Sequence, residues 1–110
     1  MEKIMTPRQY NPPHPGEVLY GLDIEPAGLT IKAVAERLGV DRKTISRIIN
    51  AKASITADMA ILLAKAFKTT PELWLNMQTN YDLWNAEKRM KQRVSRVLPF
   101  EQNFSEIRPV

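Results

Sequence analysis

The sequence predicts an all-α fold with five helices. Its apolar residues recur at steps of three and four along most of the chain, which is the periodicity of a helix with one buried face. Three of these stretches follow a threonine that can cap a helix N-terminus, namely Thr30, Thr56 and Thr70. No stretch alternates apolar and polar residues over the length of a strand.

The first helix is expected over residues 15–24. Pro15 suits the first turn of a helix, and Glu17 lies near its positive end. Apolar residues then follow at helical spacing: Val18, Leu19, Leu22 and Ile24. Pro26 and Gly28 end the segment.

Two helices of about eight residues are expected within residues 31–50, joined by a turn at Gly39. Thr30 can cap the first and Asp41 the second, and Ala35 provides a small residue where the two helices approach each other. Apolar residues mark the inner face of the second helix: Ile45, Ile48 and Ile49. These features are those of a helix-turn-helix, which lays its second helix in the major groove of DNA.

The last two helices follow directly. Thr56 caps the fourth, whose inner face comprises Met59, Ala60, Leu63, Ala64 and Phe67. Thr70 caps the fifth, with Pro71 at its first position, and this helix is expected to run to about Arg93. Its apolar residues recur at steps of three and four, and three of them form an aromatic stripe (Trp74, Tyr81 and Trp84): Leu73, Trp74, Met77, Tyr81 and Trp84. Such a stripe is typical of a core or of a subunit interface.

Composition limits the chemistry of the chain. Its 110 residues, 44% hydrophobic and 25% charged, are typical of one globular domain. The absence of cysteine excludes disulfides, thiolate zinc sites and cysteine nucleophiles, and His14 alone cannot build a metal cage. We therefore expect no cofactor, no metal and no enzymatic activity. Apolar runs are too short to span a membrane and no signal peptide is evident, so we expect a cytoplasmic protein without a membrane partner.

The ends of the chain differ from its middle. Prolines crowd residues 6–15, so residues 1–13 are expected to form an extended arm. The domain is expected over 14–93, followed by a tail over 94–110. Within the domain, His14 is expected to be a helix-start or loop residue.

The outer face of the third helix carries hydrogen-bonding side chains and no acid: Arg42, Lys43, Ser46, Arg47 and Asn50. Arginine pairs with guanine and asparagine with adenine, each worth about 1–3 kcal/mol of discrimination. Lys32, Lys52 and the amides at the helix start after Thr30 suit phosphate. Residues 28–53 hold six basic and two acidic residues, an excess equal to the +4 of the whole chain. DNA is therefore the expected partner.

Other interpretations of single residues stay open. The basic side chains of the third helix could simply solvate it, Asn50 could serve as the helix C-terminal residue, and Ser46 could bond its own backbone. A second basic cluster on the fifth helix either solvates the helix end or meets an acidic partner: Lys88, Arg89, Lys91 and Arg93.

Several segments together resemble the HigA (VapI-like) antitoxins, a branch of the phage-repressor-type helix-turn-helix proteins. They are His14-Pro15-Gly16-Glu17, the segment from Thr30 to Asn50, Ile55-Thr56-Ala57-Asp58-Met59-Ala60, Pro71-Glu72-Leu73-Trp74-Leu75-Asn76-Met77-Gln78 and Asn80-Tyr81-Asp82-Leu83-Trp84. The resemblance covers residues 12–88 and implies a lambda-repressor-like fold. One departure is Asp41, where the family often has serine and where an acid would weaken nearby phosphate contacts.

The resemblance also implies a function. Such proteins bind operator DNA as homodimers, repress their own operon and neutralise a HigB-like toxin that cleaves mRNA. Carried over to this chain, the recognition positions are Arg42, Lys43, Thr44, Ser46, Arg47 and Asn50. Dimerisation through the C-terminal helix implies an interface formed by Trp74, Met77, Tyr81 and Trp84. The alternatives are a stand-alone repressor without a toxin, and a protein-interaction module that uses the helix-turn-helix only as a scaffold.

Overall fold

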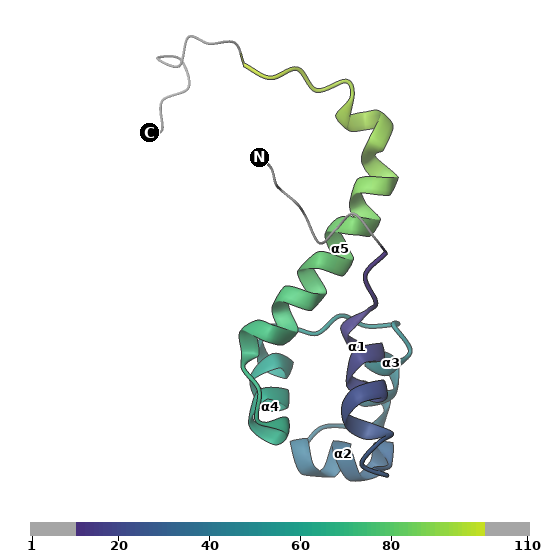
Figure 1. Cartoon of the computed structure of the whole chain (residues 1–110), viewed down its shortest axis with the longest axis vertical. Helices are drawn as coiled ribbons and strands as arrows, with labels where there is room; N and C mark the ends of the chain where they lie inside the picture. The colour runs from purple at the N-terminus through teal and green to yellow at the C-terminus, as the bar shows by residue number, and fades with distance from the viewer. Residues whose placement is uncertain (1–10, 101–110) are drawn as a thin grey trace.

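The computed structural model describes residues 11–100, and within them the chain is helical, with no strand. The elements are α1 (Pro15–Val18), η3 (Leu19–Ile24), α2 (Ile31–Leu38), α3 (Arg42–Ile49), α4 (Ala57–Phe67) and α5 (Pro71–Val94). α1 and η3 follow each other without a break, so the predicted five-helix all-α fold is confirmed. Figure 1 shows α1 to α4 grouped at one end of the molecule, while α5 continues well beyond them.

The threonine caps account for where the helices begin. The Thr30 hydroxyl oxygen accepts a hydrogen bond from the backbone N–H of Ala33 at 3.0 Å, which satisfies one of the donors left unpaired at the start of α2. Thr56 and Thr70 do the same for α4 and α5, each at 3.2 Å. The predicted starts of α2, α4 and α5 are therefore confirmed, and the threonine capping hydrogen bonds are their physical cause.

The first helix ends in an unexpected form. η3 is a π-helix, in which the N–H of Glu25 donates to the carbonyl of Tyr20, five residues back, at 2.8 Å. This pattern adds about one residue to the turn compared with an α-helix. Leu19 and Ile24, five residues apart, can then both face the core, where each is 0% exposed. The prediction that Leu22 lies on the apolar face is wrong, because the wider turn leaves it 72% exposed.

The core lies between the four shorter helices and the first turns of α5. It is formed by Leu19, Ile24, Val34, Ala35, Leu38, Ile45, Ile48, Ile55, Met59, Ala60, Leu63 and Trp74. Beyond Asn85 every residue of α5 is exposed except Ala86 and Met90, which are half-buried. The second half of this helix therefore projects from the domain with little packing of its own.

The predicted arm and tail fall mostly outside the described residues, which leave out 1–10 and 101–110. The boundaries at 13/14 and 93/94 stay predictions. In the part of the chain that the structure covers, no helix combines the length and apolarity that crossing a membrane requires.

Candidate nucleic-acid interface

The helix-turn-helix has the geometry that its sequence predicts. Gly39 ends α2 in the left-handed conformation, with φ 75° and ψ 32°, and its N–H donates to the carbonyl of Glu36. Ala35 is 1% exposed and belongs to the core, so α2 has a small side chain on its buried face. Ile45 and Ile48 are 0% and 2% exposed, so α3 is anchored through its inner face and its outer face is free.

Gly16 explains how α1 supports the recognition helix. A Cβ atom at Gly16 would lie 1.8 Å from the carbonyl oxygen of Ile48 and 3.0 Å from the Cα of Ile49. Only a residue without a side chain allows α1 to pack this closely against the backbone at the end of α3. The His14-Pro15-Gly16-Glu17 motif thus fixes the position of α3, a role that the sequence pattern did not reveal.

The beginnings of α2 and α3 share one shallow surface hollow. Its lining comprises Thr30, Ile31, Lys32, Arg42, Lys43 and Ser46. Five of these are predicted DNA-contacting residues, brought together from two helices. The hollow combines two helix N-termini with three cationic side chains, an arrangement that favours an anionic ligand such as a phosphate backbone.

Arg47 lies on the other side of α3, with Thr44, in a second hollow beside the loop that follows the helix. Its guanidinium Nη2 donates to the carbonyl of Lys52 at 3.1 Å, so Arg47 also ties this loop to α3. Ser54 is exposed and lines the same hollow. Ser54 is not among the predicted site residues, and its position in the loop between the recognition helix and α4 was the available signal.

Two polar residues, Asn50 and Asp41, lie at the two ends of α3. Asn50 is the C-terminal cap, and its side-chain amide donates to the carbonyl of Ser46 at 2.8 Å. In this structure it therefore completes the helix end. Asp41 occupies the N-cap position with an extended backbone, but its side chain makes no capping hydrogen bond. The prediction that Asp41 is the N-cap residue of α3 is confirmed for its position, and its exposed carboxylate directly precedes Arg42 and Lys43 in the chain.

A buried histidine lies behind this surface. His14 is 2% exposed and caps α1, its Nδ1 accepting a hydrogen bond from the N–H of Gly16 at 2.9 Å. Burial lowers the pKa of the His14 imidazole below its ordinary value. The carboxylates of Glu17 and Asp82 and a hydrogen bond with the Ala53 backbone oppose this shift without cancelling it. The prediction that His14 is a helix-start residue is confirmed.

Gln78 connects the recognition unit to α5. It is 5% exposed, and its Oε1 accepts a hydrogen bond from the N–H of Ile55 at 2.7 Å, in the loop between α3 and α4. Its amide nitrogen donates to Oδ1 of Asp82 at 3.0 Å. The loop that Arg47 ties to α3 is therefore also tied to α5.

The four predicted dimer-interface residues do not share one environment. Trp74 is 1% exposed, and its indole N–H donates to the hydroxyl of Thr69 at 2.8 Å. It belongs to the core of the protomer, so placing it in a subunit interface is wrong. Met77, Tyr81 and Trp84 are half-buried on α5 and keep surface available to a partner.

Comparisons with known proteins agree with this architecture. A family model described as helix-turn-helix matches residues 24–74. Antitoxin HigA-1 from Vibrio cholerae is 45% identical over 84 residues, which cover 76% of this chain and 79% of the relative.

Solved structures extend the similarity to the fold. A HigA-family addiction module antidote protein from Coxiella burnetii has a TM-score of 0.77 and 37% identity, covering 83% of this chain and 100% of that chain. The antitoxin HigA from Pseudomonas aeruginosa was solved with the higBA promoter. It has a TM-score of 0.78 and 31% identity, and the match covers 82% of this chain and 99% of that chain. The chain belongs to the HigA family of helix-turn-helix antitoxins.

Proposed function

We propose that this chain binds operator DNA through α3, represses its own operon as a homodimer and neutralises an mRNA-cleaving toxin of the HigB type. The observation that carries the DNA-binding part is the outer face of α3. It exposes Arg42, Lys43 and Arg47 near the backbone N–H groups at the start of α2, while Ile45 and Ile48 of the same helix are buried. The Pseudomonas aeruginosa relative solved with promoter DNA supports this assignment.

The contacts divide by chemistry. Arg42, Lys43, Thr44, Ser46, Arg47 and Asn50 are proposed to face the major groove. Thr30, Lys32 and Lys52 are proposed to bind phosphates on either side of it. To reach a base, the Asn50 amide must exchange its bond with the Ser46 carbonyl for one with DNA, and the cost is small because this hydrogen bond is exposed.

The homodimer is proposed to form along α5. Met77, Tyr81 and Trp84 are half-buried, and Leu73, four residues before Met77 on the same side of the helix, is 43% exposed. A large apolar surface on one helix is typical of a subunit interface. In such a dimer the two α3 helices are expected about 34 Å apart, which matches half-sites one turn apart on a palindromic operator.

Titration of labelled DNA from the chain's own upstream region, against a scrambled duplex of equal length, tests operator binding. Arg47→Ala is expected to weaken specific binding by about 1–3 kcal/mol and to relax base preference at one position. Lys65→Ala, an exposed change on α4, is the control. If each protomer neutralises about four phosphates, log K should fall with log salt at a slope of roughly −7. Equal losses on both duplexes would exclude a base-reading role for Arg47.

Co-expression with the neighbouring reading frame tests the toxin. We expect a stable complex that suppresses mRNA cleavage by the neighbour's product. If operator binding is intact but no neighbour product co-purifies, the chain acts as a stand-alone repressor.

A further inference from the structure

The loop between α3 and α4 is held by two side chains that are far from it in the sequence. His14, directly before α1, forms a hydrogen bond with the backbone of Ala53. Gln78 of α5 accepts a hydrogen bond from the N–H of Ile55 through its Oε1 at 2.7 Å, and both of these residues are buried. Because the bonds end on backbone atoms of the loop, they fix the path of its main chain.

The same loop holds the Arg47 side chain on the exposed side of α3. Nη2 of Arg47 donates to the carbonyl of Lys52 at 3.1 Å, and the N–H of Lys52 donates to the Arg47 carbonyl at 2.7 Å. A guanidinium has five N–H donors, so one bond to the loop orients the group and leaves the others for a base. Orienting a flexible side chain in advance removes part of the entropy that binding otherwise costs. The position of the Lys52 carbonyl therefore affects where the guanidinium points.

Local backbone preference alone does not explain the shape of this loop. Ala51, near its start, has a φ of 59°, which is a left-handed conformation that alanine rarely adopts. Such a conformation persists where the surrounding structure holds it. Lys52 and Ile55 are three residues apart, so a displacement of the Ile55 backbone reaches the Lys52 carbonyl through a short segment. The bond that holds Ile55 is therefore also a restraint on the partner of the arginine.

Gln78 is itself oriented by Asp82, one turn further along α5. The amide nitrogen of Gln78 donates to Oδ1 of Asp82 at 3.0 Å, which leaves the amide oxygen facing the N–H of Ile55. In the inverted orientation two donors would face each other, and no bond could form. Asp82 therefore selects the orientation in which Gln78 can hold the loop.

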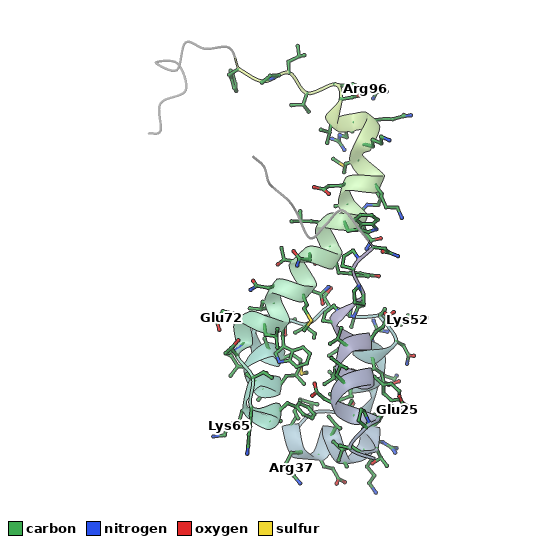
Figure 2. All side chains as sticks on the ribbon, viewed as in Figure 1. Glu25, Arg37, Lys52, Lys65, Glu72 and Arg96 are labelled. Carbon is green, nitrogen blue, oxygen red and sulfur yellow. The ribbon has the colours of Figure 1, made fainter. Side chains whose placement is uncertain are left out.

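We propose that Gln78, oriented by Asp82, is a positioning residue for base reading by Arg47. α5 then influences the recognition helix through the hydrogen bonds described above, and Gln78 needs no contact with DNA. In Figure 2, Lys52 lies on the opposite side of the domain from Glu72 near the start of α5, so this influence crosses the domain. The proposal rests on operator binding through α3, as proposed above, and adds two residues of α5 to the determinants of sequence preference.

A double-mutant cycle on the full chain tests the proposal. The measured quantity is the specificity ratio, the Kd for a scrambled duplex divided by the Kd for the chain's own upstream DNA. Gln78→Leu is expected to lower this ratio about threefold to tenfold, because Arg47 is still present but no longer held in place. In the Arg47→Ala background the same change should alter the ratio by less than about twofold, since the residue through which Gln78 acts is gone. Asn76→Leu, an exposed change on the same helix, is the control and should also stay within about twofold.

Reversing the direction of one hydrogen bond separates positioning from loss of stability. Gln78→Glu sets a second carboxylate beside Asp82 and should lower the specificity ratio, because like charges repel. Adding Asp82→Asn supplies an amide that donates to the new carboxylate, which still accepts from the Ile55 N–H, so the ratio should return to within about twofold of the original. Circular dichroism checks that every variant is folded.

Three outcomes overturn the proposal. They are an unchanged ratio in Gln78→Leu, an equal loss from Gln78→Leu in the Arg47→Ala background, and a folded Gln78→Glu/Asp82→Asn variant that is no better than Gln78→Glu. A wild-type chain that binds both duplexes equally would instead refute operator reading itself, and with it the role of Gln78. The two failures are distinguishable because the second appears before any residue is changed.

Discussion

Replacing Gly16 with alanine tests whether α1 positions the recognition helix by close backbone contact. The added Cβ would lie 1.8 Å from the Ile48 carbonyl oxygen and 2.5 Å from the Ile48 carbonyl carbon. These atoms belong to the backbone, so no side-chain rotation can relieve the clash. The Ile48 carbonyl also accepts a hydrogen bond from the N–H of Ala51 at 3.1 Å, in the turn that ends α3.

The size of the effect follows from this geometry. Because real Cβ contacts essentially never fall below 3.0 Å, α1 and α3 must separate by about 1.2 Å or more at this point. Overpacking of a well-packed site costs about 1–3 kcal/mol, and the contact with backbone places Gly16→Ala toward the upper end of that range. Alanine returns at most about 1 kcal/mol through its better helix propensity. We therefore expect a net loss of about 2 kcal/mol in the free energy of unfolding.

Urea unfolding and a thermal scan measure this loss. A change of about 2 kcal/mol corresponds to a fall in Tm of about 8–16 °C for a domain of this size. Gly21→Ala is the matched control, since a Cβ there would meet nothing within 4 Å apart from its own helix backbone and chain neighbours, and it should be neutral or stabilising. If Gly16→Ala were as stable as Gly21→Ala, with operator affinity unchanged, the idea that this contact fixes α3 would be refuted.

Two further predictions concern the buried polar residues that link the loop after α3 to α1 and α5. The lowered pKa of His14 means that the native state holds the neutral ring, so stability should be full above about pH 6.5 and fall as the pH drops below that value toward the native pKa. His14→Asn keeps a capping oxygen but does not titrate, and unfolding curves between pH 5 and about 7.5 should lose this pH dependence; an unchanged dependence would exclude His14 as its source. Gln78→Leu removes the acceptor of the buried Ile55 N–H and should cost about 1–3 kcal/mol in urea unfolding, whereas the exposed change Asn76→Leu should stay within about 0.5 kcal/mol. Equal stabilities of these two variants would contradict a structural role for the Gln78 bond.

Much of the fold could be predicted because helix boundaries depend on neighbouring residues. Thr30, Thr56 and Thr70 cap helices through hydrogen bonds that span three residues, and Gly39 takes a backbone conformation that glycine favours. The face of α3 that carries Arg42, Lys43 and Arg47 also follows from helical periodicity alone, since burying the isoleucines turns the basic residues outward.

The interactions that periodicity could not predict are those between distant segments or those that depend on an altered helix geometry. Leu22 is at an apolar position of an α-helix, but the π-helical turn moves it into solvent. Trp74 has the spacing of an interface residue, but α5 packs against α4 and buries it. The role of Gln78 requires Ile55, twenty-three residues away, to be beside it.

The sequence by itself determined the number and limits of the helices, their caps and the basic outer face of α3. All of these are set by interactions over a few residues along the chain. Only the tertiary structure decided how α1 packs through Gly16 on the end of α3, how the loop after α3 is tied to α5, and which aromatic residues remain at the surface. Those features arise where segments far apart in sequence meet, and the energies of such contacts depend on distances that no local pattern contains.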